Sequence, residues 1–343
     1  MIHRPLRLSI DRSALQHNWR WLRETSGTAC GAAVKADGYG IGARQAMAAL
    51  HAAGCRDFFV SSWAEADDLG SVPEGASLVV LHGVGPDDVE AALGSSARPT
   101  LNTVEQVARW KDVAPGRPCD VMVDTGMNRL GLRLNEIGSL EGLSIDTLMS
   151  HLACADEDHS LNGQQLARFR EVAAAATAKR YSLANSAGIC LGRDYAFDLV
   201  RPGLALYGGV PRSEAQGNIR QVAHVEAQIV QRRTIRAGES CGYGATFVAE
   251  VDTEAAILNI GYADGYLRGF SSHGSAFAGE FALPVLGRVS MDLVAIDCGA
   301  ARHLKEGDWV EIDYDLPTAS AQSGMSQYEL LTTLGHRFER RRR

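Results

Sequence analysis

The stretch Ala32-Ala33-Val34-Lys35-Ala36-Asp37-Gly38-Tyr39-Gly40 discriminates between two folds for the first two thirds of the chain. From Ala29 to about Tyr207, short apolar runs alternate with helix-like segments, a pattern typical of βα units that carry a parallel sheet. A doubly wound open sheet would have a Gly-rich dinucleotide-binding turn after its first strand, and the quoted stretch is not such a turn. Because eight units can be recognised, we expect a closed (β/α)8 barrel of the TIM type.

The expected barrel elements follow from apolar runs and from helix stop signals. Strands are expected to end near Val34, Ser61, Leu81, Leu101, Val123, Ser150, Ala184 and Val200. Helices are expected at Ala43–Ala53, Asp87–Leu93, Val104–Val113 and Gln164–Lys179. The barrel is predicted to occupy residues 1–215.

Beyond about Gly217 the pattern changes to alternating or compact apolar runs separated by turn signals, which predicts a mainly antiparallel β domain over residues 216–343. Its expected strands are Ala223–Val230, Ala255–Ile260, Leu283–Leu286, Leu293–Ile296 and Trp309–Ile312. The basic tail Arg337–Arg343 is expected to be a solvated, frayed end.

Composition excludes several classes of function. The chain has 34 basic and 41 acidic residues, a formal net charge of −7, which disfavours nucleic acid as the main partner. No segment has the ~18 consecutive apolar residues of a membrane span, and the N-terminus lacks the apolar run of a secretory signal. The seven cysteines form no CxxC pair, so neither a metal centre nor a disulfide framework is indicated. We expect a cytoplasmic protein with reduced cysteines and no membrane partner.

Polar residues follow the predicted strands, at the barrel face where active sites lie. Lys35 comes directly after an apolar strand, where an ammonium is costly unless it is deprotonated, paired or covalently used. A neutral lysine amine suits Schiff-base chemistry with a carbonyl compound or with pyridoxal phosphate. The other residues at this face are His82, Asn102, Asp124 with Arg129, His151, Asn185 with Ser186, and Arg201.

Two further groups fit pyridoxal phosphate. Tyr39 and Ser186, with the backbone amides around Gly203 and Leu204, can bind a phosphate, as barrels commonly do near strands seven and eight. Arg201 can face the pyridine nitrogen, where an Arg or Asp partner tunes the cofactor's electronics.

Seven collinear motifs resemble those of the alanine racemases. The segment Ala33-Val34-Lys35-Ala36-Asp37-Gly38-Tyr39-Gly40-Ile41-Gly42 is similar to the cofactor-lysine signature of that family. Six more segments agree in order and spacing, at 123–131, 150–153, 184–187, 200–208, 242–247, and 261–266 followed by 287–292. The resemblance therefore spans nearly the whole chain.

The resemblance implies a homodimer that interconverts L- and D-alanine by a two-base mechanism through a pyridoxal-phosphate external aldimine. Lys35 would hold the cofactor and serve as one base, and Tyr243 would be the other base, delivered from the second subunit of a head-to-tail dimer. The implied cofactor-binding residues are Lys35, Tyr39, His151, Ser186, Arg201, Gly203 and Leu204. The implied substrate-binding residues are Arg129, Met291 and Tyr262. The D-alanine would supply peptidoglycan synthesis.

The chain departs from the family pattern at two positions. Met122 stands where many members have a carbamylated lysine oriented toward the arginine equivalent to Arg129. We therefore expect something else to orient Arg129, with a bound anion such as chloride, helped by Asn128 or Asn102, as the candidate. His336 stands where some members have a phosphate-binding tyrosine, and it is not assigned to the cofactor.

Three other kinds of protein share part of this pattern. A racemase of broader specificity would accept serine as well as alanine. A fold type III amino-acid decarboxylase would show a substrate-binding acidic residue and a cysteine motif in the β domain, whereas this chain has its Gly-Tyr-Gly and Ser-Met-Asp segments there. The non-enzymatic pyridoxal-phosphate homeostasis proteins lack a second domain, whereas 126 residues follow from Asn218 to the end of this chain.

Overall fold

The computed structural model describes residues 3–342, which form two compact units. The barrel unit contains Leu15–Leu206 and Val210–Arg220, and the β unit contains the described residues up to Ala14, Tyr207–Gly209, and the chain from Gln221 onward. Each unit is described by itself.

The barrel unit is built on parallel strands. Seven of them form one sheet in sequence order: β3 (Ala32–Ala33), β4 (Asp57–Val60), β5 (Ser77–Val80), β6 (Arg98–Leu101), β7 (Cys119–Met122), β8 (Ile145–Met149) and β9 (Arg180–Ser182). An eighth, β10 (Leu199–Val200), pairs with β2 (Ala29–Cys30), the strand just before β3.

Backbone hydrogen bonds close this circle of strands. On one side of β10, the Gly31 N–H donates to the Val200 carbonyl and the Ala33 N–H to the Pro202 carbonyl, both at 2.9 Å. On its other side, the Arg201 N–H donates to the Ala184 carbonyl, also at 2.9 Å. The expected (β/α)8 barrel is therefore confirmed, with β2 and β3 acting as two short pieces of its first strand.

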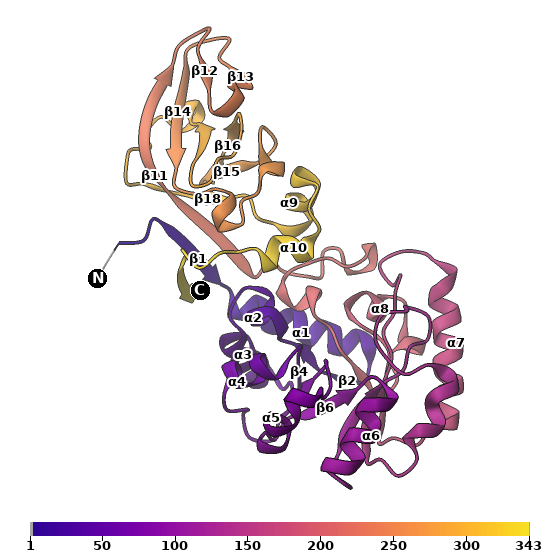
Figure 1. The fold of residues 1–343 in the computed structure, drawn as a ribbon. Helices are drawn as coiled ribbons and strands as arrows, with labels where there is room; N and C mark the ends of the chain where they lie inside the picture. Colours follow the sequence, from indigo (N-terminus) through magenta and orange to yellow (C-terminus); the bar gives the residue numbers. More distant parts are fainter. Residues whose placement is uncertain (1–2, 343) are drawn as a thin grey trace. The chain divides into compact units, whose positions relative to one another are not determined.

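Helices lie around the strands of this unit (Figure 1). They are α1 (Arg12–Ser26), α2 (Lys35–Tyr39), α3 (Ala43–Ala53), α4 (Trp63–Leu69), α5 (Val89–Gly94), α6 (Val104–Val113), α7 (Ser160–Ala175) and α8 (Ser186–Cys190). The bounds of α3 and α6 are those expected from the sequence. Helix α7 begins and ends four residues earlier than expected, because the His159 side chain caps its start and Ala176 is already extended.

The N-terminal ends of the barrel strands carry a network of buried and half-buried ion pairs. Arg98 contacts Asp120 at 3.1 Å and Asp146 at 3.2 Å, and Arg180 contacts both Asp57 and Asp146 at 2.9 Å. Asp120 is completely buried, and burial raises its pKa to about 6 despite the Arg98 charge. This end of a barrel serves stability rather than catalysis.

The β unit is a closed antiparallel barrel with two strands added at its side. The closed set is β11 (Ala223–Ile235), β14 (Thr253–Leu258), β17 (Val294–Asp297), β16 (Phe281–Leu286), β15 (Ser275–Ala278) and β18 (Trp309–Ile312), which pairs back with β11. The short hairpin β12 (Ser240–Cys241) with β13 (Phe247–Val248) and the helices α9 (Leu316–Ser323) and α10 (Gln327–Thr332) complete the unit. The expected mainly antiparallel β domain is confirmed, although β15 had not been expected.

Both chain ends differ from the expectation. Residues 1–215 were expected in the barrel, but β1 (Leu6–Ile10) pairs antiparallel with β11 and groups with the β unit. The physical reason is the alternation in this strand, where Leu6, Leu8 and Ile10 are buried on one face, as in a strand paired within a sheet.

The expectation of a frayed tail is also wrong for the described residues. Strand β19 (Glu339–Arg342) pairs in parallel with β1, so the backbone of the tail is tied down by the sheet, and the side chain of Arg337 is held by ion pairs. Arg343 lies outside the described residues. Within residues 3–342, no helix has the length and apolar character needed to cross a membrane.

Candidate active site

Lys35 lies at the start of a left-handed turn that directly follows the first barrel strand. Ala36, Asp37, Gly38 and Tyr39 all have φ between 51° and 62°. For residues with a Cβ this conformation costs roughly 1–2 kcal/mol each, so the surrounding contacts must stabilise it. Strain of this kind clusters at functional sites, where it fixes the direction of a side chain.

Several contacts hold this turn in place. The carboxylate of Glu65 accepts the Ala36 N–H at 2.9 Å and the Ser61 N–H at 2.7 Å, so it links the Lys35 turn to the end of the next strand. The Asp37 carboxylate accepts the Ala43 N–H at 2.8 Å, which ties the turn to the start of α3. Lys35 is thereby presented from a braced backbone rather than from a free loop.

The turn also brings Tyr39 against the segment that follows β10. A Cβ added to Gly203 would lie 2.0 Å from the Tyr39 hydroxyl oxygen, so only glycine allows this approach. The Ser186 hydroxyl accepts the N–H of Gly203 at 3.0 Å and that of Ala205 at 3.2 Å. The structure therefore brings Tyr39, Ser186 and the Gly203–Leu204 backbone together, as the sequence predicted.

Positive charge converges at the same end of the barrel. Burial, and then the Arg129 charge, lower the pKa of Lys35, against the opposing effect of Glu65. Burial, followed by the charges of Arg201, Arg129 and Lys35, lowers the pKa of His151 to about 3. At neutral pH His151 is therefore neutral.

Arg201 is buried, with an exposed fraction of 7%. Its guanidinium donates to the Ser182 hydroxyl and, at 2.5 Å, to the Ser150 carbonyl. Burial lowers its pKa to about 10, so it keeps its proton at neutral pH. These bonds hold the guanidinium inside the barrel mouth.

Arg129 lies on the loop that follows β7 and is exposed. The loop is closed by the Asp124 N–H, which donates to the Leu132 carbonyl, and by the Asp124 carboxylate, which accepts the N–H groups of Gly126 and Met127. Among residues 3–342, no side chain or backbone carbonyl is bonded to the Arg129 guanidinium.

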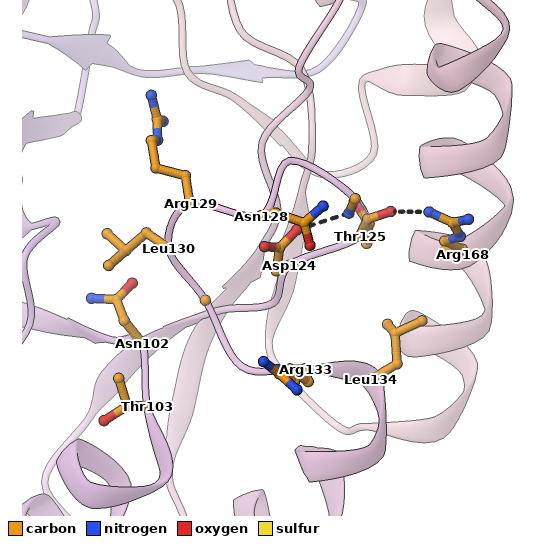
Figure 2. Close-up of a pocket in the computed structure, with 12 residues that line it drawn as sticks. Asn102, Thr103, Asp124, Thr125, Asn128, Arg129, Leu130, Arg133, Leu134 and Arg168 are labelled. Carbon is orange, nitrogen blue, oxygen red and sulfur yellow. Dashed lines mark hydrogen bonds between the residues drawn. The ribbon is translucent and has the colours of Figure 1, made fainter.

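A cavity of about 680 Å³ lies around this loop, between Asn102 and Arg168 (Figure 2). Arg168 of α7 donates to the Thr125 carbonyl at 2.8 Å. Met122 packs in an apolar cluster with Phe59 and Met149 and supplies no group that could orient Arg129. Within the part of the chain that the structure describes, the buried Asn102 Oδ1 has no hydrogen-bond partner, so it is available to a bound group.

The other predicted site residues belong to the β unit. Tyr243 lies in the turn between β12 and β13 with 68% of its surface exposed, and Met291 is 53% exposed. Tyr262 begins a short 3₁₀ turn whose N–H groups bond the segment around Met291. Arg288, three residues before Met291, lies against Gly242 and Gly244 on either side of Tyr243.

The barrel residues fit pyridoxal phosphate. They combine a braced lysine of lowered pKa, a glycine backbone against which a hydroxyl packs with no room for a Cβ, and a buried guanidinium. The lysine amine can attach to an aldehyde, and the glycine backbone with its hydroxyl can bind a phosphate. The buried guanidinium can face a heteroaromatic nitrogen.

Some supporting residues were missed by the sequence reasoning. Glu65 is one of them, although Ser62-x-x-Glu65 is a recognisable capping signature. Gln165 is another, because it is fully buried in α7 and bonds Thr125 and the His151 carbonyl. No local pattern marks Gln165. Of the remaining polar candidates, His82 and His336 are exposed.

Comparison with known proteins identifies the family. The family model for "Alanine racemase, N-terminal domain" matches residues 10–211, and the model for "Alanine racemase, C-terminal domain" matches residues 222–342. An alanine racemase of Rhizobium meliloti is 41% identical, covering 97% of this chain and 96% of its own length. A biosynthetic alanine racemase of Agrobacterium fabrum is 40% identical, covering 98% and 93%.

A solved structure agrees. The alanine racemase of Bartonella henselae, with covalently bound pyridoxal phosphate, superposes with a TM-score of 0.91 at 37% identity, covering 99% of each chain. The sequence relatives, the domain matches and the superposition all extend over both units. This chain therefore belongs to the alanine racemase family of pyridoxal-phosphate-dependent isomerases.

Proposed function

We propose that this chain interconverts L- and D-alanine with Lys35 and Tyr243 as its two bases. The activity and the cofactor follow from the family; the assignment of roles to individual residues is our proposal. The observation that carries it is the convergence of a lysine of lowered pKa, a Tyr39–Ser186–Gly203 phosphate cradle and the buried Arg201 at one end of the barrel.

The barrel residues divide the binding of the cofactor between them. Lys35 is its point of attachment through Nζ, and Tyr39, Ser186 and the Gly203–Leu204 backbone hold its phosphate. Arg201 faces the pyridine nitrogen and keeps that nitrogen unprotonated, because a guanidinium does not give up its proton at neutral pH. When bound, pyridoxal phosphate withdraws electrons from the substrate Cα–H bond and so makes that proton removable.

Racemisation requires proton transfer at both faces of the substrate Cα. At one face the Lys35 side chain takes the proton as an amine or gives it back as an ammonium, and at the opposite face Tyr243 takes the proton as a phenolate or gives it back as a hydroxyl. Arg129 binds the substrate carboxylate, and the backbone of Met291 contacts the same carboxylate. The neutral His151 supports Arg201 without adding a further charge.

We further propose that Tyr243, Tyr262 and Met291 act in the barrel of a second copy, in a head-to-tail homodimer. The support is the exposure of Tyr243 and Met291 in the single chain, together with apolar residues that are exposed as well: Val248 at 53%, Val251 at 70% and Leu293 at 40%. A tyrosine base that is two thirds exposed lacks the excluded-water environment that proton transfer favours, and a partner's barrel would supply it.

The first experiment tests the cofactor site and the reaction together. The purified protein is reduced with borohydride, digested and mapped, and a parallel sample is incubated with L-alanine and its product separated on a chiral column. We expect a pyridoxyl group on Lys35 and an even mixture of L- and D-alanine. Labelling at another lysine would refute the site, and alanine that stays L would refute the activity.

The second experiment tests the shared site. Lys35→Ala and Tyr243→Phe are each made, and the two inactive proteins are co-expressed. In a head-to-tail dimer, each mixed dimer has one site with both bases intact, so random mixing restores about a quarter of the wild-type activity. If both bases of a site came from one chain, no activity would return, and the shared-site proposal would fail.

We also propose that the D-alanine formed supplies cell-wall peptidoglycan. Expression of this chain in a bacterium that requires D-alanine tests the proposal, because growth without added D-alanine should be restored. Tyr243→Phe is the matched negative control for this growth assay.

A further inference from the structure

Three segments of the β unit meet at a single buried carboxylate. Asp264 is completely buried, and its two oxygens accept Arg337 Nε at 2.6 Å and Arg337 Nη2 at 2.7 Å. The remaining Arg337 nitrogen, Nη1, donates to Asp292 at 2.6 Å. One guanidinium therefore bridges the turn that starts with Tyr262 and the segment that contains Met291, although it comes from the far end of the chain.

The same three segments are joined through their backbones. The Tyr262 N–H donates to the Ser290 carbonyl and the Ala263 N–H to the Met291 carbonyl, both at 3.1 Å. The Gly335 N–H donates to the Asp264 carbonyl at 3.2 Å. Tyr262 and Met291 are thus presented by one bonded assembly rather than by two independent loops.

This assembly has little free space. A Cβ on Gly261 would lie 2.4 Å from the carbonyl oxygens of Ser290 and Met291, and one on Gly335 would lie 2.9 Å from the Ala263 carbonyl oxygen. Backbones in such close contact cannot shift singly, because a displacement of one is transmitted to the others.

The charges explain why an arginine is needed at this place. A carboxylate without solvent must be paired and hydrogen-bonded, and the planar guanidinium satisfies both oxygens of Asp264 at once. A lysine has the same charge but is a point donor, so it cannot bridge Asp264 and Asp292 with the same geometry. The two carboxylates raise the pKa of Arg337 above its ordinary value.

We propose that Arg337 is a positioning residue that sets the width of the substrate site through Tyr262 and Met291, and so favours alanine over serine. The inference rests on the proposed function, because it takes Tyr262 and Met291 to line the substrate site of the partner subunit. Arg337 itself touches neither substrate nor cofactor. It acts through the two turns that it joins.

Arg337→Lys is the test variant, and Arg341→Lys is the matched control. Arg341 belongs to the same basic tail and has a similar side-chain exposure, 41% against 45%, but its ion pair is with Glu339 on the same strand. Steady-state kinetics are measured with L-alanine, D-alanine and L-serine, and the affinity for pyridoxal phosphate is measured by titration.

For Arg337→Lys we expect KM for both alanine enantiomers to rise about tenfold while kcat falls less than threefold, since displacement of positioning groups weakens binding geometry first. The ratio of kcat/KM for serine to that for alanine should rise, and the affinity for the cofactor should not change. Arg341→Lys should resemble the wild type in all four measurements. An unchanged KM and an unchanged serine-to-alanine ratio in folded Arg337→Lys would overturn the inference.

Two additional variants keep the result interpretable. Tyr262→Phe and Tyr262→Ala test the underlying role of the Tyr262 side chain, since a side-chain change at Met291 would leave its backbone contact in place. If both variants leave KM unchanged, the proposed function is wrong at Tyr262, whereas if only Arg337→Lys leaves KM unchanged, the inference alone fails. Should Arg337→Lys not fold, the double variant Asp264→Asn with Arg337→Gln replaces it, because it leaves no buried unpaired charge. A wild-type serine-to-alanine ratio in that double variant would also refute the inference.

Discussion

The replacement of Asp120 by asparagine tests the electrostatics of the ion-pair network at the N-terminal ends of the barrel strands. Burial raises the pKa of Asp120 from its ordinary 3.8 to about 6 in the folded chain. At ~1.4 kcal/mol for each pKa unit, this difference between the ordinary and the folded-state pKa corresponds to a contribution of about 3 kcal/mol to stability. Because the folded pKa is the higher one, this contribution to stability is fully present below pH 3.8 and is lost as the pH rises through about 6.

Asparagine does not titrate, so Asp120→Asn should lack this pH dependence. With these two pKa values, the wild type loses about 1.4 of the 3 kcal/mol between pH 5 and pH 7.5. Relative to the wild type, the variant should therefore become more stable by about 1.4 kcal/mol as the pH rises over that range, seen as a larger free energy of unfolding. Comparing the two proteins at each pH cancels the titration of groups that do not interact with Asp120.

The assay is urea unfolding followed by tryptophan fluorescence, in a Trp309→Phe background so that the signal comes from the barrel unit. The opposite sign would refute the reasoning: if the Arg98 ion pair outweighed burial, the pKa of Asp120 would be lowered, and Asp120→Asn would become more destabilising as the pH rises. A difference that does not change with pH would show that the Arg98 charge cancels the effect of burial on the Asp120 pKa, and it would also contradict the reasoning.

Three further changes test the barrel site. Gly203→Ala places a Cβ 2.0 Å from the Tyr39 hydroxyl, so Tyr39 must move and lose its charge-assisted contact with the phosphate. The affinity for pyridoxal phosphate, measured by absorbance titration, should fall about 10- to 100-fold. An unchanged affinity would show that Tyr39 does not bind the phosphate. Glu65→Gln keeps only one of two backbone acceptors, so amide hydrogen exchange at residues 36–40 should accelerate, and protection equal to wild type would contradict the bracing role. Asn102→Asp supplies a negative charge beside Arg129, which should reduce any dependence of KM on added chloride; the same dependence in variant and wild type would count against an anion at this position.

Much of the fold could be predicted because the deciding signals are local. Strand ends, the helices at Ala43–Ala53 and Val104–Val113, and the change of pattern beyond Gly217 all follow from apolar periodicity and helix stop signals. The N-terminal strand also alternates with a period of two, but nothing within it indicates that its partner is β11, more than 200 residues away.

The basic tail shows the limit of local reasoning. A run of arginines is usually a solvated end, and here it is a strand and an ion-pair donor because its neighbours in space are β1 and the buried Asp264. The left-handed turn after Lys35 is a similar case. Its glycines hint at unusual backbone, but Ala36, Asp37 and Tyr39 adopt positive φ only because Glu65 and the α3 terminus hold them there.

The sequence by itself determined the chemistry of this protein. Residue types at the ends of eight strands, and seven motifs in order, indicate a cofactor lysine, a phosphate cradle and a guanidinium, because these depend on which side chains the chain carries. Tertiary structure alone decided how those groups are held: which carboxylate braces the lysine turn, which pKa values burial shifts, and which arginine joins the turns of Tyr262 and Met291. Such properties depend on distances and desolvation between residues far apart in the chain, which no local pattern encodes.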